Sequence, residues 1–216
     1  MIKVKKGPKP QILIKNEKKW NNVFSKAWKK YKNEGGKSPK ANYNKPSIKK
    51  ATKKEFAGKC AFCEFDCTPG YYGDIEHFRP KSLYCRFAHT WSNLLFSCRI
   101  CNGNKGNKFP KKDQIIKPTT ENPEVFFTYE FLLNDSWIVL NALNQRAQNT
   151  IDLMDLNRDD LSEDRAEKLH ELQRSITALR DAGADDEIVD NIIQPYMEKN
   201  HEYSGMFKFF HENNMI

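Results

Sequence analysis

The apolar positions in the first quarter of the chain predict one amphipathic helix between irregular segments. Apolar side chains recur every three or four residues within residues 16–31, and lysines occupy the opposite face. The pair Gly35-Gly36 is expected to end this helix. Residues 2–14 alternate loosely between apolar residues and Lys and contain two prolines, which favours a weak strand or an extended arm. Residues 37–50, rich in Lys, Asn, Ser and Pro, are typical of a loop.

The last third of the chain reads as helical. From Leu143 onward the apolar residues follow a helical period, and Asn157 followed by two acidic residues is a candidate N-cap. One apolar stripe then covers residues 161–179, with Gly183 as its end, and a further helix is expected over residues 188–197. Such a stripe indicates the core of a helical bundle or a surface that docks a partner.

The middle of the chain has shorter elements. The apolar runs 125–131 and 137–140 flank Asn134-Asp135-Ser136, which predicts a β-hairpin. Residues 60–110 are dense in Cys, Gly, His and aromatic residues and show little periodicity. This composition is typical of a small module that a metal ion holds together.

These patterns together predict an α+β protein in three parts. The first part, residues 1–59, is a lysine-rich arm and helix. The second, residues 60–123, is a compact metal-stapled core, and the third, residues 124–216, is a mostly helical region.

The cysteine spacing predicts a structural zinc site. Four of the six cysteines form two CxxC pairs, Cys60 with Cys63 and Cys98 with Cys101. Two such pairs can place four thiolates around one tetrahedral Zn²⁺. Cys67 could compete as a ligand, but Cys67 and Cys85 are more simply interpreted as thiols outside the site.

The charge is distributed very unevenly along the chain. Residues 1–59 contain nineteen lysines and three acidic residues, for a net charge of +16. Residues 60–123 carry +3 and residues 124–216 carry −11. The first part therefore suits a polyanion such as nucleic acid, and the last part suits protein contacts. A solvated lysine-rich face without a partner is the simpler alternative.

The sequence also predicts a compartment. It holds no apolar run near the 18–20 residues or so that cross a bilayer, and no signal-peptide pattern follows Met1. We expect a cytoplasmic protein without a membrane partner, in which the cysteines stay reduced.

The residues between and after the CxxC pairs can support hydrolysis of a phosphodiester bond. This reaction needs a general base for water and a hard divalent cation with oxygen ligands. His77 is the candidate base, and Asn93 can hold its ring. Glu76 or Asp74, together with the side-chain oxygen of Asn102, can ligate Mg²⁺ or Mn²⁺.

Three nearby cations are candidates for contacts with the scissile phosphate. Arg79, Lys81 and Lys105 could grip it or neutralise charge in the transition state. Ordinary solvated cations are the alternative for each. Cys85 and His89 resemble a metal pair but lack a second half, so we interpret them as bystanders.

The pattern CxxC, acid-His, Asn-Leu, CxxC-Asn-x-x-Lys resembles that of the HNH (ββα-metal) endonucleases over about residues 60–110. The resemblance implies a β-hairpin carrying the acid-His pair and a short helix after the second CxxC. It implies His77 as the general base, Glu76 and Asn102 as ligands of the catalytic metal, and Asn93 as the residue that orients the loop. Glu replaces the more common Asp before the His, which leaves Asp74 as a competing ligand.

A narrower resemblance extends over about residues 50–180. The strings Ile-Glu-His-Phe-Arg-Pro-Lys and Cys-Arg-Ile-Cys-Asn resemble the HNH nuclease subunits of Septu and retron-associated antiphage defence systems. The resemblance implies a bacterial cytoplasmic nuclease bound to a PtuA-like ABC-type ATPase. We expect DNA as the favoured substrate. In retron systems a reverse transcriptase and its DNA–RNA product join the complex.

The sequence leaves other functions open. The chain could bind nucleic acid through a zinc-stapled module without cleaving it, or it could cut RNA such as a transfer RNA. It could also be a subunit that stays silent until a partner releases it.

Overall fold

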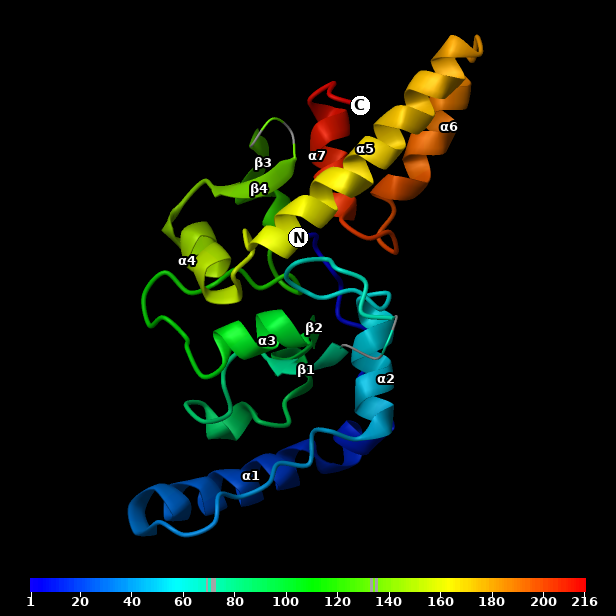
Figure 1. Ribbon diagram of the computed structural model, residues 1–216. Coiled ribbons are helices and arrows are strands. Elements are labelled where there is room, and N and C mark those ends of the chain that lie inside the picture. The colour runs from blue at the N-terminus through cyan, green and yellow to red at the C-terminus, as the bar shows by residue number, and fades with distance from the viewer. Residues whose placement is uncertain (69, 71–72, 133, 135) are drawn as a thin grey trace.

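Figure 1 shows the computed structural model, which describes residues 1–68, 70, 73–132, 134 and 136–216. Helix α1 lies at one end of the molecule, and a hairpin of α5 and α6 extends from the other end. The helices and strands are α1 (Gln11–Glu34), α2 (Pro46–Glu55), β1 (Gly73–His77), β2 (Leu94–Cys98), α3 (Arg99–Lys105), β3 (Phe127–Leu132), β4 (Trp137–Ala142), α4 (Gln145–Met154), α5 (Asp159–Asp181), α6 (Asp186–Met197) and α7 (Ser204–Glu212). This mixture of helices with two small antiparallel sheets confirms the α+β prediction.

Strands β1 and β2 form the sheet at the centre of the molecule, and α3 follows β2 directly. Their register pairs Gly73 with Cys98 and His77 with Leu94. A Cβ atom on Gly73 would lie 2.0 Å from Cζ of Phe96, so only glycine allows this close approach.

The N-terminal segment differs partly from the prediction. Residues 1–10 are extended, as the arm alternative predicts, but α1 begins at Gln11, five residues earlier than expected. The carbonyl of Pro10 accepts hydrogen bonds from the backbone N–H groups of Leu13 and Ile14. The loose alternation over residues 2–14 therefore hid the first turn of a helix.

The prediction of a loop over residues 37–50 was wrong at its C-terminal end. Helix α2 begins at Pro46, whose fixed φ suits the first helical position. Its lysines obscured a short apolar face on which Ile48 and Thr52 are fully buried.

The predicted hairpin of the third part is confirmed, with β3 and β4 antiparallel. Asp135 of its predicted turn lies outside the described residues. The predicted N-cap was wrong, because Arg158 is the residue that precedes α5. The Asn157 amide instead accepts from the N–H of Leu140 and donates to its carbonyl, both at 2.8 Å. An amide can pair with the free edge of a strand as well as with a helix terminus.

Helices α5 and α6 follow the predicted stripes, whereas α7 was not predicted from the sequence.

A large buried cluster joins residues from the N-terminal arm, the CxxC segments, β4, α5 and α7. A smaller cluster lies under α1 and α2, namely Leu13, Ile48, Ile75, Trp91 and Leu94. The division at residues 59 and 123 stays a prediction. In the described parts of the chain no helix is long and apolar enough to cross a membrane.

Candidate active site

The four predicted cysteines form one buried cluster. Cys60 and Cys63 lie in the turns before β1, Cys98 ends β2 and Cys101 lies in α3, and their Sγ atoms are all within 4.8 Å of one another. The N–H of Ala61 donates to the carbonyl of Phe96 at 2.8 Å, which fixes the first CxxC segment against β2. This donor set has the residue types and compactness that a tetrahedral Zn²⁺ requires.

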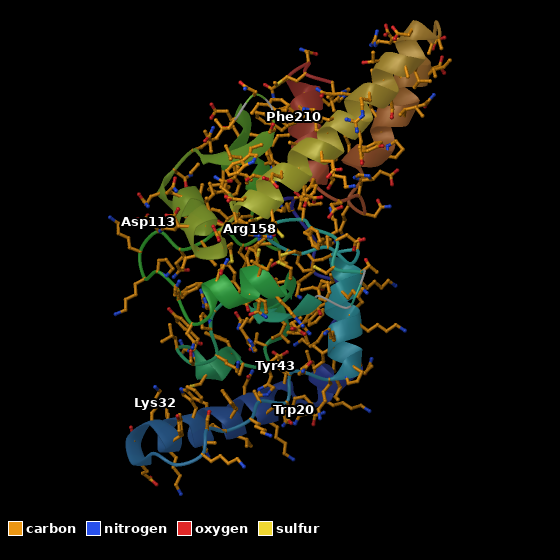
Figure 2. All side chains as sticks on the ribbon, viewed as in Figure 1. Trp20, Lys32, Tyr43, Asp113, Arg158 and Phe210 are labelled. Carbon is orange, nitrogen blue, oxygen red and sulfur yellow. The ribbon has the colours of Figure 1, made fainter. Side chains whose placement is uncertain are left out.

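The four thiols of the cluster differ in their tendency to ionise, since the pKa values of Cys60 and Cys98 are lowered and those of Cys63 and Cys101 are raised. Although burial opposes ionisation, hydrogen bonds from the neighbouring thiols hold the pKa of Cys60 well below its usual range. The guanidinium of Arg158, labelled in Figure 2, lies 3.9 Å from Sγ of Cys101 and offsets negative charge there. Cys67 is buried outside the cluster, and burial raises the pKa of its thiol.

A second site lies where β1 and α3 meet. A cavity of about 170 Å³ is lined by His77 and Glu76 from β1 and by Asn102 from α3. Tyr43 and Lys81 also line it, together with Ile75, Pro80, Gly106 and Asn107. Three of the predicted site residues, brought from two elements, therefore share one polar cavity.

His77 is held in a defined tautomer. Its Nε2 lies 2.8 Å from the carbonyl oxygen of Ala88, which can only accept, so Nε2 carries the hydrogen and Nδ1 keeps a lone pair. Burial, with a smaller effect of the nearby Lys81 charge, lowers the pKa of His77 to about 3. The ring is therefore neutral at pH 7, and the edge of Tyr43 packs against it at 4.4 Å between centroids.

Glu76 forms an ion pair inside the protein. Its Oε1 accepts a short hydrogen bond from Nζ of Lys105, which is fully buried and also donates to the carbonyl of His77 at 2.8 Å. Burial raises the pKa of Glu76 and lowers that of Lys105, and each charge opposes the shift of the other. Because its side chain is fully buried, Lys105 contacts Glu76 rather than solvent.

We expect Lys105→Met to destabilise the fold by about 3 kcal/mol, because it leaves the buried Glu76 carboxylate without its cation. The matched control is the double variant Glu76→Gln/Lys105→Met, which removes both charges and should recover most of the loss. Urea unfolding of the four proteins in the cycle measures the coupling. Additive losses in the double variant would contradict the pairing.

Asn93 holds the long connection between β1 and β2. Its Oδ1 accepts from the N–H of Arg79 at 2.8 Å, and its Nδ2 donates to the carbonyls of Arg79 and Phe87 at 3.0 and 3.2 Å. The guanidinium of Arg79 lies over the rings of Phe87 and Tyr84, 5.5 and 5.8 Å from their centroids. Asn93 thus orders the loop that carries Ala88, the partner of His77.

Asp74 lies apart from the cavity lining. Its carboxylate is half-exposed and pairs with Lys49 of α2 at 2.9 Å and with Arg99 of α3 at 3.7 Å. Successive residues of a strand point to opposite faces, so Asp74 and Glu76, two residues apart in β1, share a face. Their different partners therefore arise from what packs at each end of the strand.

Two residues near His77 make contacts that the sequence did not reveal. Tyr43 lies in a lysine-rich loop whose sequence gives no sign of contact with His77. His89, interpreted as a bystander, donates from Nδ1 to Oδ1 of Asn21 at 3.2 Å and accepts at Nε2 from the N–H of Asn42 at 2.9 Å. It thereby ties α1 to the loop that carries Tyr43.

The contacts of His89 require the neutral ring and predict loss of stability in acid. Burial lowers the pKa of His89 to about 4, below the value of about 6.5 expected when unfolded. Below pH 6.5 the unfolded chain therefore binds the additional proton, and stability falls as the pH decreases toward 4. We expect His89 to account for a loss of about 2 kcal/mol between pH 7 and pH 5.

Urea unfolding at several pH values measures this effect, with His89→Gln as the matched control. The control lacks the titrating ring, and it should lose less stability than the wild-type chain over the same pH range. Equal pH dependence in the two proteins would show that His89 is not the cause.

Comparison with known proteins finds relatives of this chain in two Bacillus species. No protein-family model matches it. It is 32% identical over 162 residues to the Septu protein PtuB of Bacillus thuringiensis, an alignment that covers 73% of this chain and 55% of the relative. This chain is similar in sequence to Septu protein PtuB. The PtuB of Bacillus mycoides (strain KBAB4) is 27% identical over 168 residues, covering 63% of this chain and 56% of that protein.

The chain spans about half the length of the curated PtuB relatives that it matches. The similarity supports the predicted resemblance to Septu subunits. The cluster of four cysteines is observed in the structure of this chain itself.

Proposed function

We propose that the chain is a metal-dependent HNH endonuclease that hydrolyses phosphodiester bonds, with DNA as the favoured substrate. The observation that carries this proposal is the cavity that collects His77, Glu76 and Asn102. A basic nitrogen and two side chains with oxygen donors then surround a space large enough for a phosphate group. The succession of β1, β2 and α3 beside a four-cysteine cluster supports a ββα-metal core.

His77 acts in this proposal as the general base. Its Nδ1 takes a proton from a water molecule that attacks phosphorus in line. The carbonyl of Ala88 fixes the tautomer, and Asn93 orders the loop that presents this carbonyl. The negative charge of a bound phosphate would raise the pKa of His77 from about 3 toward the working pH, which improves its basicity where the reaction occurs.

Glu76 and Asn102 would hold the catalytic Mg²⁺ or Mn²⁺, since both offer oxygen donors to the same cavity. When bound, the metal supplies charge stabilisation for the leaving 3′ oxygen, and the product keeps a 5′ phosphate. Glu76 is favoured over Asp74 as the ligand because Glu76 lines the cavity, whereas Asp74 lies outside the lining and pairs with Lys49 and Arg99. Lys105 acts by holding the Glu76 carboxylate in position.

The remaining cations have different places in the proposal. Lys81 lines the cavity and is the side chain best placed to contact the scissile phosphate. Arg79 lies on the aromatic rings of the 78–93 connection, within reach of the phosphates that flank the cut. Both contacts would be strengthened by the low dielectric of a partly closed site.

The similarity to PtuB supports a role for the chain in antiphage defence. We propose that it is the effector subunit of a Septu-type complex with an ABC-type ATPase related to PtuA. A retron reverse transcriptase and its DNA–RNA product are further partners to test. The acidic third part of the chain, with a net charge of −11, suits such protein contacts.

The test is a cleavage assay with the purified chain, alone and with its ATPase. Substrates are duplex DNA, single-stranded DNA and total transfer RNA, each with and without Mg²⁺ or Mn²⁺. Metal-dependent DNA products with 5′ phosphates would support the proposal. Cleavage of RNA alone to a cyclic phosphate would change the substrate, because the 2′ hydroxyl then serves as nucleophile. Binding without cleavage under every condition would overturn the enzymatic function.

A further inference from the structure

We propose that the outer face of α1 binds the sugar–phosphate backbone of duplex nucleic acid at a surface separate from the cavity. This outer face is defined by six exposed lysines along the helix, namely Lys15, Lys18, Lys19, Lys26, Lys29 and Lys30. At about 1.5 Å per residue they cover roughly 22 Å, and at about 100° per residue they share one side.

The packing of α1 fixes the direction of this face. Leu13 and Phe24 are buried on the inner side, and Nε1 of Trp28 donates to the carbonyl of Ser82 at 3.0 Å. The aromatic ring of Trp20 packs on His89 from the same side. The six lysines are exposed and lie on the side of the helix opposite these buried residues.

The positive charge of the outer face is hardly neutralised within α1, all of which the structure describes. The helix contains two acidic residues, and Glu17 is turned inward, where it accepts from the N–H of Trp91 at 3.2 Å and pairs with Lys9 at 2.8 Å. Glu34 lies in the last turn and makes an exposed pair with Lys30 at 3.7 Å, which contributes little. A straight positive stripe thus remains available to a polyanion.

The residue types on the face favour nucleic acid over a protein partner. Lysine is depleted at the centre of protein interfaces, where aromatic residues and Arg are enriched, and α1 contains no Arg. Its exposed apolar residues, Ile14 and Val23, lie singly, which is ordinary for a surface. Lysine contacts with phosphate groups are the usual source of binding that does not depend on base sequence.

The aromatic residues of α1 favour a duplex over a single strand. Proteins that bind single strands stack the bases on exposed aromatic rings. In α1, Trp20 packs against His89, and Trp28 against Phe24 and Tyr31, on the inner side. The outer face offers charge without a stacking platform.

The outer face is distinct from the proposed catalytic site. None of the described residues that line the cavity belongs to α1. The surface would anchor a long duplex while another stretch of nucleic acid, or another molecule, occupies the cavity. The inference therefore does not depend on the proposed hydrolysis, and it can be tested without added divalent metal.

The test compares the full chain with the variant Lys18→Gln/Lys26→Gln/Lys29→Gln. Fluorescence anisotropy measures binding to duplexes of about 30 base pairs, in DNA and RNA forms, over a range of salt concentrations. We expect the variant to bind at least about tenfold more weakly and the slope of log K against log salt to fall by about three, equally for unrelated sequences.

Two controls locate the effect. The variant Arg174→Gln/Lys199→Gln/Lys208→Gln removes the same charge from the acidic third part and should leave the slope unchanged. The variant Lys18→Arg/Lys26→Arg/Lys29→Arg keeps the charge and should bind like the wild-type chain. Equal weakening by both Gln variants would overturn the inference, because the effect would then follow net charge alone.

Chemical acetylation gives an independent measurement on the unmodified chain. A bound duplex should protect Lys26 and Lys29 from acetylation and leave Lys199 reactive. Equal reactivity with and without duplex would also overturn the inference, and protection by an acidic protein in place of a duplex would assign the face to a protein partner. Catalytic variants that no longer cleave should still give the same binding and acetylation results. The two proposals can therefore be overturned independently of each other.

Discussion

His77→Ala is expected to slow cleavage of nucleic acid by about 10²- to 10⁴-fold, which is the usual contribution of a positioned general base. The ring is buried and neutral, and its Nε2–H is committed to Ala88, so no other described side chain of the cavity offers an equivalent basic nitrogen. The variant should bind substrate with nearly unchanged affinity, because the proposed phosphate contacts come from other residues. Single-turnover cleavage and equilibrium binding measure the two quantities.

The matched control for His77→Ala is His170→Ala. His170 lies on α5, and its ring stacks on that of Phe131. It is not among the residues that line the cavity. This variant makes the same His→Ala change outside the cavity, and it should leave the cleavage rate unchanged. Thermal unfolding of both variants checks that His77→Ala still folds. Wild-type cleavage by a folded His77→Ala chain would exclude His77 as the base.

Cys98→Ser is expected to abolish zinc binding and to destabilise the fold by about 5 kcal/mol or more, as losses of structural metals do. Cys98 joins the end of β2 to α3, and its Sγ accepts from the N–H of Cys101 at 3.4 Å. The cluster therefore fixes the helix that carries Asn102 against the strand pair that carries His77. Loss of zinc should consequently remove cleavage as well.

Zinc content by elemental analysis and the unfolding midpoint measure this prediction. Cys85→Ser is the matched control, because Cys85 lies outside the cluster and its Sγ contacts Oγ of Ser25 at 3.3 Å. The control should retain about one zinc ion per chain and a stability close to that of the wild type. A Cys98→Ser chain with full zinc content would contradict the four-cysteine site.

The features of this protein that could be predicted from the sequence are those specified by residues close together in the chain. The CxxC pairs specify their own geometry, since two thiols separated by two residues can meet one ion whatever surrounds them. Helices α5 and α6 repeat their apolar residues at a helical period, so their existence followed from the pattern. Helix α2 was missed because its buried face consists of three residues among lysines, of which only Ile48 is apolar, so the sequence shows no helical stripe there.

The sequence by itself determined the candidate zinc ligands, the candidate general base, the candidate carboxylate ligands of the catalytic metal, the α+β class and the uneven charge. The tertiary structure decided which partners these residues have. It placed Glu76 and Asp74, two residues apart, against different cations, buried Lys105, and brought Tyr43 to His77 from a distant segment. The physical reason is that spacing along a chain controls only short-range geometry, whereas burial, ion pairing and pKa depend on atoms that folding brings together.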